Sequence, residues 1–433
     1  MRFYALEREA AEIRDPIHGY IYADELEKEL IDTPTFQRLR RIRQLASAYL
    51  TYPGAQHSRF EHSVGAMYLA GRAGKHLASR GILDKESVTE IRAAALLHDI
   101  GHGPFSHLFE ELLLEKKNIV HEDLTRRIII ETEIKDVLVR HGINPKKFAT
   151  LPIGISMDHP RYVNDIIAGF LSVDTMDYLL RDSYFTGVEY GRVDVHRVIN
   201  SFEVVNERLS IEKASIYALE SLLLARYEMF RTVYFHRTVR AGAIMLVKAM
   251  SLSDAEFGFT DISSLPAFLK LTDEVTLSNL VNLKSQSRDG KFARQLAIDY
   301  RDRRLLKLVF EKVVQRKDEF LQKIFSRKMF RDNFAEEISG RANVPSRYVF
   351  VDVPTTPSVP TTSSRESISE ILLVTRDSQG RRIETIKVGD LPIASAILGY
   401  MDILRVYTFS KYRKDVETAM DSIFEREGFV ENV

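Results

Sequence analysis

The segment ALLHDIGHGPFSH, residues 95–107, places three histidines and an aspartate among apolar and small residues. Polar side chains cost free energy to bury unless they find partners. His98 and Asp99 are adjacent, and adjacent side chains on a helix point about 100° apart, so both can approach one ion. Seven of the 12 histidines fall between residues 57 and 121, which concentrates ionisable groups in this part of the chain.

Two further polar clusters accompany this segment. HSRFEHS (57–63) contains Arg59 and His62, and LSVDTMDYLLRDS (171–183) interrupts an apolar helical pattern with aspartates. Two imidazoles and two carboxylates would form a mixed site for one divalent ion, either Mn²⁺, Fe²⁺, Zn²⁺ or, as a poorer fit, Mg²⁺; the candidates are His62, His98, Asp99 and Asp174. Such an ion lowers the pKa of water and polarises a phosphoryl oxygen, and a nearby histidine can then protonate the leaving oxygen.

Each cluster also has a purely structural interpretation. A single buried histidine is usually a hydrogen-bonded core residue, and aspartates on a helix usually lie on an exposed face or at a cap. A satisfied core does not need many ionisable groups, however, and this region holds several more: Arg59, His102, His107 and His121. Their co-occurrence favours an active site.

The elements that must position these residues are mostly helices up to about residue 330. Apolar residues at three- and four-residue spacing predict helices over 33–45, 61–78, 86–100, 214–236 and 294–314. Thr33-Pro34 and Asp84 are plausible helix starts, Gly101 and Gly103 plausible stops, and 12–24 a short hairpin.

The composition changes near residue 345. Strands are predicted at 348–354, 370–376, 381–388 and 403–409, with a Pro/Ser/Thr-rich loop at 355–367, a hairpin turn at 377–380 and a final helix at 414–427. We therefore expect a mainly α fold, with a helical domain over 1–335 and a small α+β domain over 345–433 that serves oligomerisation or regulation.

The bulk composition excludes several functions. Lysine plus arginine equals aspartate plus glutamate at 61 each, so net charge favours neither nucleic acid nor an acidic membrane. The chain has no cysteine, which excludes disulfides, thiolate metal sites and a cysteine nucleophile. No apolar run approaches the length of a membrane span, and the N-terminal residues have no signal-peptide core, so we expect a cytoplasmic protein.

The ordered series His62, His98-Asp99 and Asp174 follows the H…HD…D signature of HD-domain phosphohydrolases. The chain resembles, more closely, the deoxynucleoside triphosphate (dNTP) triphosphohydrolases of that superfamily. The motifs that carry the resemblance span about 15–190: DPIHGYI, DTPTFQRLRRIRQL, YPGAQHSRFEHSVGAMYLA, LLHDIGHGPFSH and VDTMDYLLRDSYFTG. RYEMFRTVYFHRTV (226–239) matches more weakly, and the last hundred residues only loosely.

The resemblance implies that an HD-domain helical core binds one divalent metal ion per active site and that a metal-activated water attacks the α-phosphate. The products would be a deoxynucleoside and inorganic triphosphate. The implied metal ligands are His62, His98, Asp99 and Asp174. The resemblance implies that Arg59 contacts phosphate and that His107 donates the proton. It places His102 and His121 beside the triphosphate and Glu110 near the proton donor. The implied substrate contacts are Gln44, Leu45, Tyr178 and Asp182 around the sugar, and Arg226, Tyr234, His236 and Arg237 downstream.

Two positions depart from the family pattern. Glu110 stands where the family carries an aspartate, and Thr175 replaces a phosphate-contacting lysine, so other residues must supply part of the triphosphate binding.

At a second site, the resemblance implies that Asp32, Gln37 and Arg40 recognise the guanine of an activator, GTP or dGTP, between subunits of a homotetramer. The arginines of residues 38–43 have the simpler interpretation of a solvated helix face.

Two rival functions remain open at this point. The same fold could act as a nucleotide phosphatase or phosphodiesterase, which would release orthophosphate or open a cyclic nucleotide. The basic stretch 287–307 could instead belong to a non-catalytic nucleic-acid-binding protein, but the carboxylates in that stretch and the zero net charge argue against strong binding of this kind.

Overall fold

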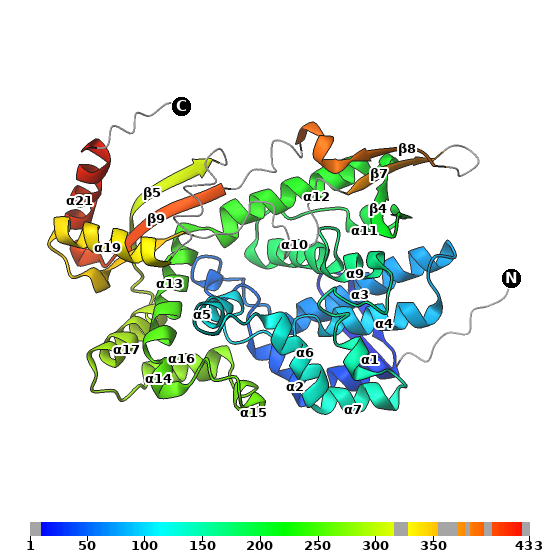
Figure 1. Ribbon diagram of the computed structural model, residues 1–433, viewed down its shortest axis with the longest axis horizontal. Helices are drawn as coiled ribbons and strands as arrows, with labels where there is room; N and C mark the ends of the chain where they lie inside the picture. Colours follow the sequence, from blue (N-terminus) through cyan, green and yellow to red (C-terminus); the bar gives the residue numbers. More distant parts are fainter. Residues whose placement is uncertain (1–9, 316–327, 354–370, 377–381, 394–400, 427–433) are drawn as a thin grey trace. The chain divides into compact units, whose positions relative to one another are not determined.

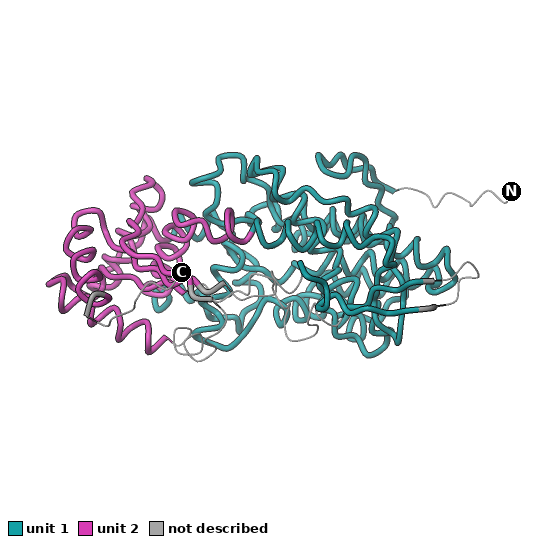
Figure 2. Tube along the Cα trace, turned by 90° about the horizontal axis from the view of Figure 1, so that it is seen from above, with its two compact units in different colours: residues 1–229, 254–279, 361–397 teal, residues 230–253, 280–360, 398–433 magenta. Residues whose placement is uncertain are grey.

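A computed structural model describes residues 10–315, 328–353, 371–376, 382–393 and 401–426. The chain divides into two compact units (Figure 2): the first unit comprises residues 1–229, 254–279 and 361–397, and the second unit 230–253, 280–360 and 398–433. This division differs from the predicted boundary at 335–345, because segments distant in sequence pack together within each unit. None of the helices in the described ranges combines the length and apolar character needed to cross a bilayer.

The first unit begins with the predicted hairpin, β1 (Ala11–Asp15) and β2 (Gly19–Ala23), paired antiparallel. Its centre consists of α3 (Arg59–Ser79), α4 (Lys85–Leu97) and α10 (Val173–Thr186), with α4 and α10 both packed against α3. The predicted starts at Thr33 and Asp84 are confirmed, since each side chain caps its helix. These helices position the candidate metal ligands: His62 lies in α3, His98 and Asp99 directly follow α4, and Asp174 lies in α10.

The first unit contains further helices, most of which are labelled in Figure 1. They are α1 (Glu25–Ile31), α2 (Pro34–Gln37), α5 (His107–Lys117), α6 (His121–Glu131), α7 (Glu133–Arg140), α8 (Pro145–Phe148), α9 (Arg161–Ala168), α11 (Val195–Ile199), α12 (Ile216–Met229), α14 (Asp254–Phe257), α15 (Leu265–Phe268) and α16 (Asp273–Val281). The helix predicted over 33–45 is wrong in its second half. After α2 the chain forms one 3-10 turn. An isolated antiparallel bridge then pairs Arg43 with Ser58, Gln44 N donates to His57 O, and residues 44–47 form a turn.

A four-stranded sheet of the first unit has the order β3-β4-β7-β8. Its strands are β3 (Phe202–Val205), β4 (Arg208–Glu212), β7 (Leu372–Arg376) and β8 (Arg382–Lys387). β7 and β8 confirm two predicted strands, but β7 pairs in parallel with β4, which the sequence analysis placed in a helical region. The predicted turn at 377–380 and the loop at 355–367 lie outside the described residues.

The second unit contains a three-stranded antiparallel sheet of order β5-β9-β6. Its elements are a π-helical turn (Phe230–Tyr234), α13 (Arg237–Leu252), α17 (Arg288–Arg301), β5 (Lys307–Gln315), α19 (Lys328–Ala342), β6 (Val349–Asp352), β9 (Met401–Thr408) and α21 (Arg413–Arg426). In Figure 1, β5 and β9 lie side by side, with α19 and α21 near them. α19, β6, β9 and α21 contribute to one apolar core: Ile338, Val344, Val349, Val406, Val416, Ala419, Met420 and Ile423.

Two predicted helices end early in the structure. The helix predicted over 294–314 ends at Arg301, and β5 begins at Lys307. Arg303 has a φ of 57°, which breaks the helix, and the apolar run that follows pairs with β9. The helix predicted over 214–236 changes from α12 to the π-helical turn after Met229. The predicted mainly α fold, with an α+β region towards the C-terminus, is confirmed.

Candidate metal centre and surrounding site

Three helices of the first unit bring the four candidate metal ligands together. His62 lies in the first turn of α3, His98 and Asp99 follow the end of α4, and Asp174 lies in the first turn of α10. His62 Nε2 is 3.1 Å from Asp174 Oδ1 and 3.2 Å from His98 Nε2. Asp99 Oδ1 is 3.3 Å from His98 Nε2. Ligand atoms about 2.1 Å from one ion lie about 3 Å apart when they bind at right angles, so these separations fit a shared ion.

The other ring nitrogen of each histidine is already engaged. His62 Nδ1 donates to Asp177 Oδ2 at 2.9 Å, and His98 Nδ1 donates to the Ala95 carbonyl at 2.7 Å. A metal-ligating histidine almost always donates its second N–H to a carboxylate or carbonyl, which fixes the tautomer and the ring orientation. Both Nε2 atoms are therefore left for a metal.

Asp177 is itself held by buried partners. His18 Nε2 donates to it at 2.7 Å, and Arg181 Nε and Nη2 donate at 2.8 and 3.0 Å. Arg181 also donates to Asp15 at 2.7 Å. A Cβ at Gly65 would collide with Asp177 and Arg181, so α10 can approach α3 this closely only because residue 65 is a glycine.

Sequence reasoning assigned no role to His18, Asp15, Asp177 or Arg181. One signal was available, because Asp174, Asp177 and Arg181 follow at three- and four-residue spacing and so share one face of α10. The hairpin residues carried no comparable signal, since their contact with α10 depends on packing.

The donor set suits a divalent cation. Although burial alone would lower the pKa of His62, hydrogen bonds to Asp174 and Asp177 and the charge of Asp99 raise it to about 10. The carboxylates thus favour positive charge at this point. A set of imidazole nitrogens and carboxylate oxygens suits Mn, Fe or Zn better than Mg.

A second cluster consists of histidines around Glu110. Its side chains come from the turn after α4 and from the starts of α5 and α6. The rings of His102 and His121 stack with centroids 3.9 Å apart. Glu110 accepts from His121 Nδ1 at 2.7 Å and from His107 Nδ1 at 2.9 Å. Burial alone would raise the pKa of Glu110, but the charge and hydrogen bonds of these two histidines hold it far below its usual range. Burial alone would lower the pKa of His121, but Glu110 raises it to about 8. The His107 side chain is 68% exposed, so solvent or a ligand can reach it.

Arg59 lies between the two clusters. Its Nη1 donates to Asp99 and its Nε donates to Ser106 Oγ at 2.7 Å. Within the described residues, Arg59 Nη2 and Gln44 Oε1 are buried without a hydrogen-bond partner. Buried polar atoms are rarely left unpaired, so these two indicate that a polar ligand belongs here. The backbone bonds from Arg59 N to Ile42 O and from Gln44 N to His57 O bring the segment that leads into Gln44 and Leu45 beside the start of α3.

Tyr178, Asp182 and Arg226 also lie in the first unit. Arg226 Nη1 donates to Thr175 Oγ1 at 2.9 Å, and its Cζ is 5.7 Å from the centre of the Tyr178 ring. Burial raises the pKa of the Tyr178 hydroxyl well above its usual value. Asp182 accepts from His57 Nε2 at 2.7 Å. A guanidinium therefore stands next to Thr175.

Tyr234, His236 and Arg237 belong to the second unit, where β9 holds their backbone. Arg405 Nη1 donates to the Phe235 carbonyl at 2.6 Å, and the Tyr407 hydroxyl donates to the Arg237 carbonyl at 3.0 Å. Their predicted role as substrate contacts stays a prediction.

The three predicted activator residues lie close together at the end of α1 and in α2 and the 3-10 turn. Gln37 Nε2 donates to the Ile31 carbonyl at 2.8 Å, and Gln37 Oε1 accepts from Arg40 Nε at 2.8 Å. Arg40 Cζ lies 3.4 Å from the centre of the Phe60 ring. Asp32 follows α1 and is exposed.

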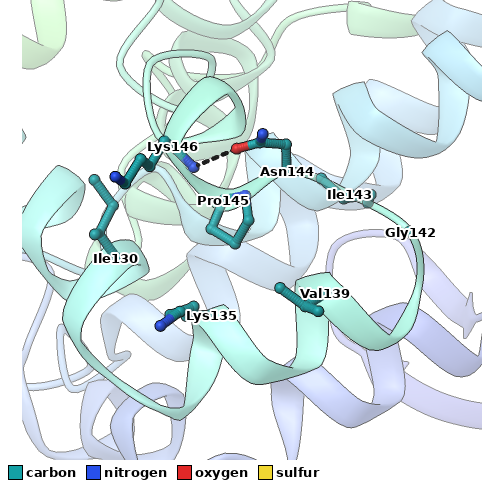
Figure 3. Close-up of a pocket in the computed structure, with 8 residues that line it drawn as sticks. All are labelled: Ile130, Lys135, Val139, Gly142, Ile143, Asn144, Pro145 and Lys146. Carbon is teal, nitrogen blue, oxygen red and sulfur yellow. Dashed lines mark hydrogen bonds between the residues drawn. The ribbon is translucent and has the colours of Figure 1, made fainter.

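A surface hollow of about 470 Å³ has none of the candidate site residues in its lining (Figure 3). It is lined by residues at and between α6, α7 and α8: Ile130, Lys135, Val139, Gly142, Ile143, Asn144, Pro145 and Lys146. None of them is a candidate site residue, so the hollow does not bear on the metal centre.

The chain is similar to known families and proteins. Residues 59–181 match the HD domain, and residues 193–428 match the HD associated region. The chain is 38% identical over 254 residues to the uncharacterized protein YwfO of Bacillus subtilis, covering 57% of this chain and 58% of that protein. It is 30% identical over 331 residues to the deoxynucleoside triphosphate triphosphohydrolase SAMHD1 homolog of Dictyostelium discoideum, covering 72% of this chain and 62% of that protein.

Among solved structures, a hypothetical protein from Aquifex aeolicus aligns with a TM-score of 0.75 and 28% identity, covering 95% of this chain and 99% of that one. The chain spans less than two thirds of the length of either curated relative named above.

Proposed function

The chain belongs to the family of proteins that join an HD domain to an HD-associated region, and we propose that it is a metal-dependent phosphohydrolase that cleaves dNTPs into a deoxynucleoside and inorganic triphosphate. The observation that carries the proposal is the convergence of His62, His98 and Asp174, with Asp99 beside them, next to the unpartnered buried atoms of Arg59 and Gln44. The similarity to a dNTP triphosphohydrolase of Dictyostelium supports this choice of substrate.

The four ligands would hold one divalent cation, which supplies Lewis acidity towards water and phosphoryl oxygen when bound. In the proposed reaction a water oxygen bonds to the α-phosphorus and the bond from that phosphorus to the 5′-oxygen breaks. Water gives up one proton, and the leaving 5′-oxygen takes one. His107 is the proton donor, because its ring is accessible and Glu110 fixes its Nδ1.

Binding of the triphosphate is assigned to fixed cations. Arg59 keeps Nη2 free of protein partners in the described chain, and a guanidinium recognises phosphate oxygens well. We assign to Arg226, which donates to Thr175, the positive charge that the family pattern described above places at position 175. Tyr178 and Asp182 are assigned to the sugar, where a tyrosine packed under C2′ would crowd a 2′-hydroxyl and favour deoxyribose.

Regulation and assembly form a second part of the proposal. GTP or dGTP would bind at Asp32, Gln37 and Arg40, between subunits of a homotetramer, with the carboxylate accepting from guanine N1 and N2 and the guanidinium donating to O6. Unchanged turnover of a single pure dNTP on addition of GTP or dGTP would contradict this part and leave the hydrolase proposal standing.

Product analysis tests the reaction. The protein is incubated with each dNTP and Mn²⁺ or Mg²⁺, and the products are separated by ion exchange. Free triphosphate supports the proposal, whereas orthophosphate or an opened cyclic nucleotide identifies the alternative, an HD-domain phosphatase or phosphodiesterase.

The metal ligands are tested by His98→Ala and Asp99→Ala, which should abolish both bound metal and turnover. His159→Ala is the matched control, because His159 pairs with Glu90 at 2.9 Å away from the candidate ligands. Turnover retained by the His98 or Asp99 variant would refute the assignment.

A further inference from the structure

The turn between α4 and α5 ends in an uncommon backbone conformation. It carries His102 and leads directly into His107, the first residue of α5. Phe105 and Ser106 have φ values of 59° and 57°, and Ser106 combines its φ with a ψ of −122°. Non-glycine residues persist in such conformations only where their surroundings hold them, and they concentrate at functional sites.

A buried carboxylate holds this turn from a segment far along the chain. Asp273, at the start of α16, is 1% exposed. Its Oδ1 accepts from Phe105 N at 2.7 Å, and its Oδ2 accepts from Arg43 N at 3.1 Å. Burial raises the pKa of Asp273 to about 6 despite these hydrogen bonds. A carboxylate is thus kept in a position that disfavours its charge, against the strained part of the turn.

The same turn is connected to the metal centre through Ser106. Its hydroxyl donates to the Arg43 carbonyl at 2.7 Å and accepts from Arg59 Nε at 2.7 Å. Arg59 in turn pairs with Asp99. Asp273 therefore reaches Ser106 by two routes. One is its bond to the amide of the preceding residue, Phe105; the other is its bond to Arg43 N, because the Arg43 carbonyl accepts from the Ser106 hydroxyl.

A second contact of the same kind reaches His102. Arg38 is buried and donates from Nη2 to the His102 carbonyl at 2.7 Å and from Nε to the Leu271 carbonyl at 3.2 Å. Segment 271–273 is therefore linked to the turn at two points, through Arg38 to the His102 carbonyl and through Asp273 to the Phe105 amide. Asp273 is the first residue of α16, and an aspartate that only stabilised the start of this helix would not need to bond to the turn.

We propose that Asp273 is a positioning residue, which holds the Phe105–Ser106 turn so that His107 presents its imidazole to the leaving oxygen. Within the described residues, the hydrogen bonds and ion pair of Asp273 lead to Phe105 and Arg43, so it acts through the turn. The inference rests on the proposed function, because it gives His107 the role of proton donor.

The kinetic test compares Asp273→Asn with Asp165→Asn. Asp165 is a matched control, because it is also a buried aspartate of the first unit whose pKa burial raises, and it accepts from Leu209 N at 3.1 Å. Asp273→Asn should lower kcat for the best dNTP by about 100-fold, the loss that a displacement of about 1 Å can cause. KM, bound metal and Tm should stay near those of Asp165→Asn. Equal kcat in the two variants would overturn the proposal.

A second measurement does not depend on turnover. In protein labelled at histidine Cε1, the His107 signal is assigned with His107→Gln and compared between wild type and Asp273→Asn. It should move or broaden while the signal of His141, a remote surface histidine, stays in place. An unmoved His107 signal overturns the proposal. If wild type hydrolyses no dNTP, the proposed function fails, and this signal alone decides whether Asp273 positions His107.

Ser106→Ala keeps the test decisive if Asp273→Asn does not fold. It removes the hydroxyl between the Arg43 carbonyl and Arg59 without burying a new polar group. The same loss of kcat and the same displacement of the His107 signal are expected. Wild-type kcat together with an unmoved His107 signal would overturn the proposal.

Discussion

Glu110→Gln gives the sharpest test of the histidine cluster. Glu110 accepts from His121 and His107, and it is the main reason that the pKa of His121 stands at about 8 and not at 6.5 or lower. A glutamine keeps the shape of the side chain but removes the charge. Burial then acts against a weaker opposing field, so the pKa of His121 should fall to 6.5 or below.

The size of the effect follows from the pKa of His121. A rise from 6.5 to about 8 corresponds to roughly 2 kcal/mol of free energy of unfolding. Because the folded-state pKa is raised, this stabilisation is fully present below pH 6.5 and is lost as the pH rises through 8. The wild-type protein should therefore lose about 2 kcal/mol between pH 6 and pH 9 from this group, and Glu110→Gln should lose little.

The assay combines a titration with denaturation. Histidine Cε1 signals of chelator-treated protein are followed from pH 5 to pH 10, and the free energy of unfolding is measured in urea at both ends of that window. Glu29→Gln is the control, because Glu29 pairs with His141 at 3.1 Å on the surface and its loss should leave the His121 signal unchanged. Turnover of Glu110→Gln should fall about 100-fold. An unshifted His121 midpoint in Glu110→Gln would refute the reasoning.

Three further outcomes are expected. Asp177→Asn should weaken Mn²⁺ binding about 10- to 100-fold in a titration of chelated protein, because His62 loses its carboxylate acceptor; unchanged affinity would show that Asp177 does not orient a ligand. Arg226→Ala should raise KM for a dNTP by about tenfold, the worth of one charge-assisted hydrogen bond, and an unchanged KM would remove Arg226 from phosphate binding. Ile338→Ala should lower the free energy of unfolding by about 2–5 kcal/mol, measured in urea, because Ile338 lies in the second unit's core; bound metal should not change, and a loss of metal would contradict the separation of roles.

Local patterns predicted elements well where one period dominated. The helices around 61–78 and 86–100, the hairpin at 12–24 and the strands after 345 were all recognised from spacing and turn residues. Residues 307–314 were assigned to a helix because a short apolar run fits either structure. Its pairing with β9 decides for a strand, and that pairing is not a local property.

The parallel pair β4·β7 illustrates the same limit for domain organisation. Ile211 faces Leu373 in that pair, although the two residues lie far apart in sequence. Composition changes near residue 345, and that change suggested a boundary there. The compact units follow the long-range strand pairing instead, so the strands after residue 370 are divided between the two units.

By itself, the sequence determined the chemical character of the candidate site. It identified His62, His98-Asp99 and Asp174, whose side chains are nitrogen and oxygen ligands for a divalent ion. The structure places each of them at or next to a helix end. Only the tertiary structure decided how they are oriented. His62 meets Asp177 from 115 residues away, and Phe105 meets Asp273 from 168 residues away. Contacts of this kind arise from the packing of helices against one another, which no local periodicity encodes.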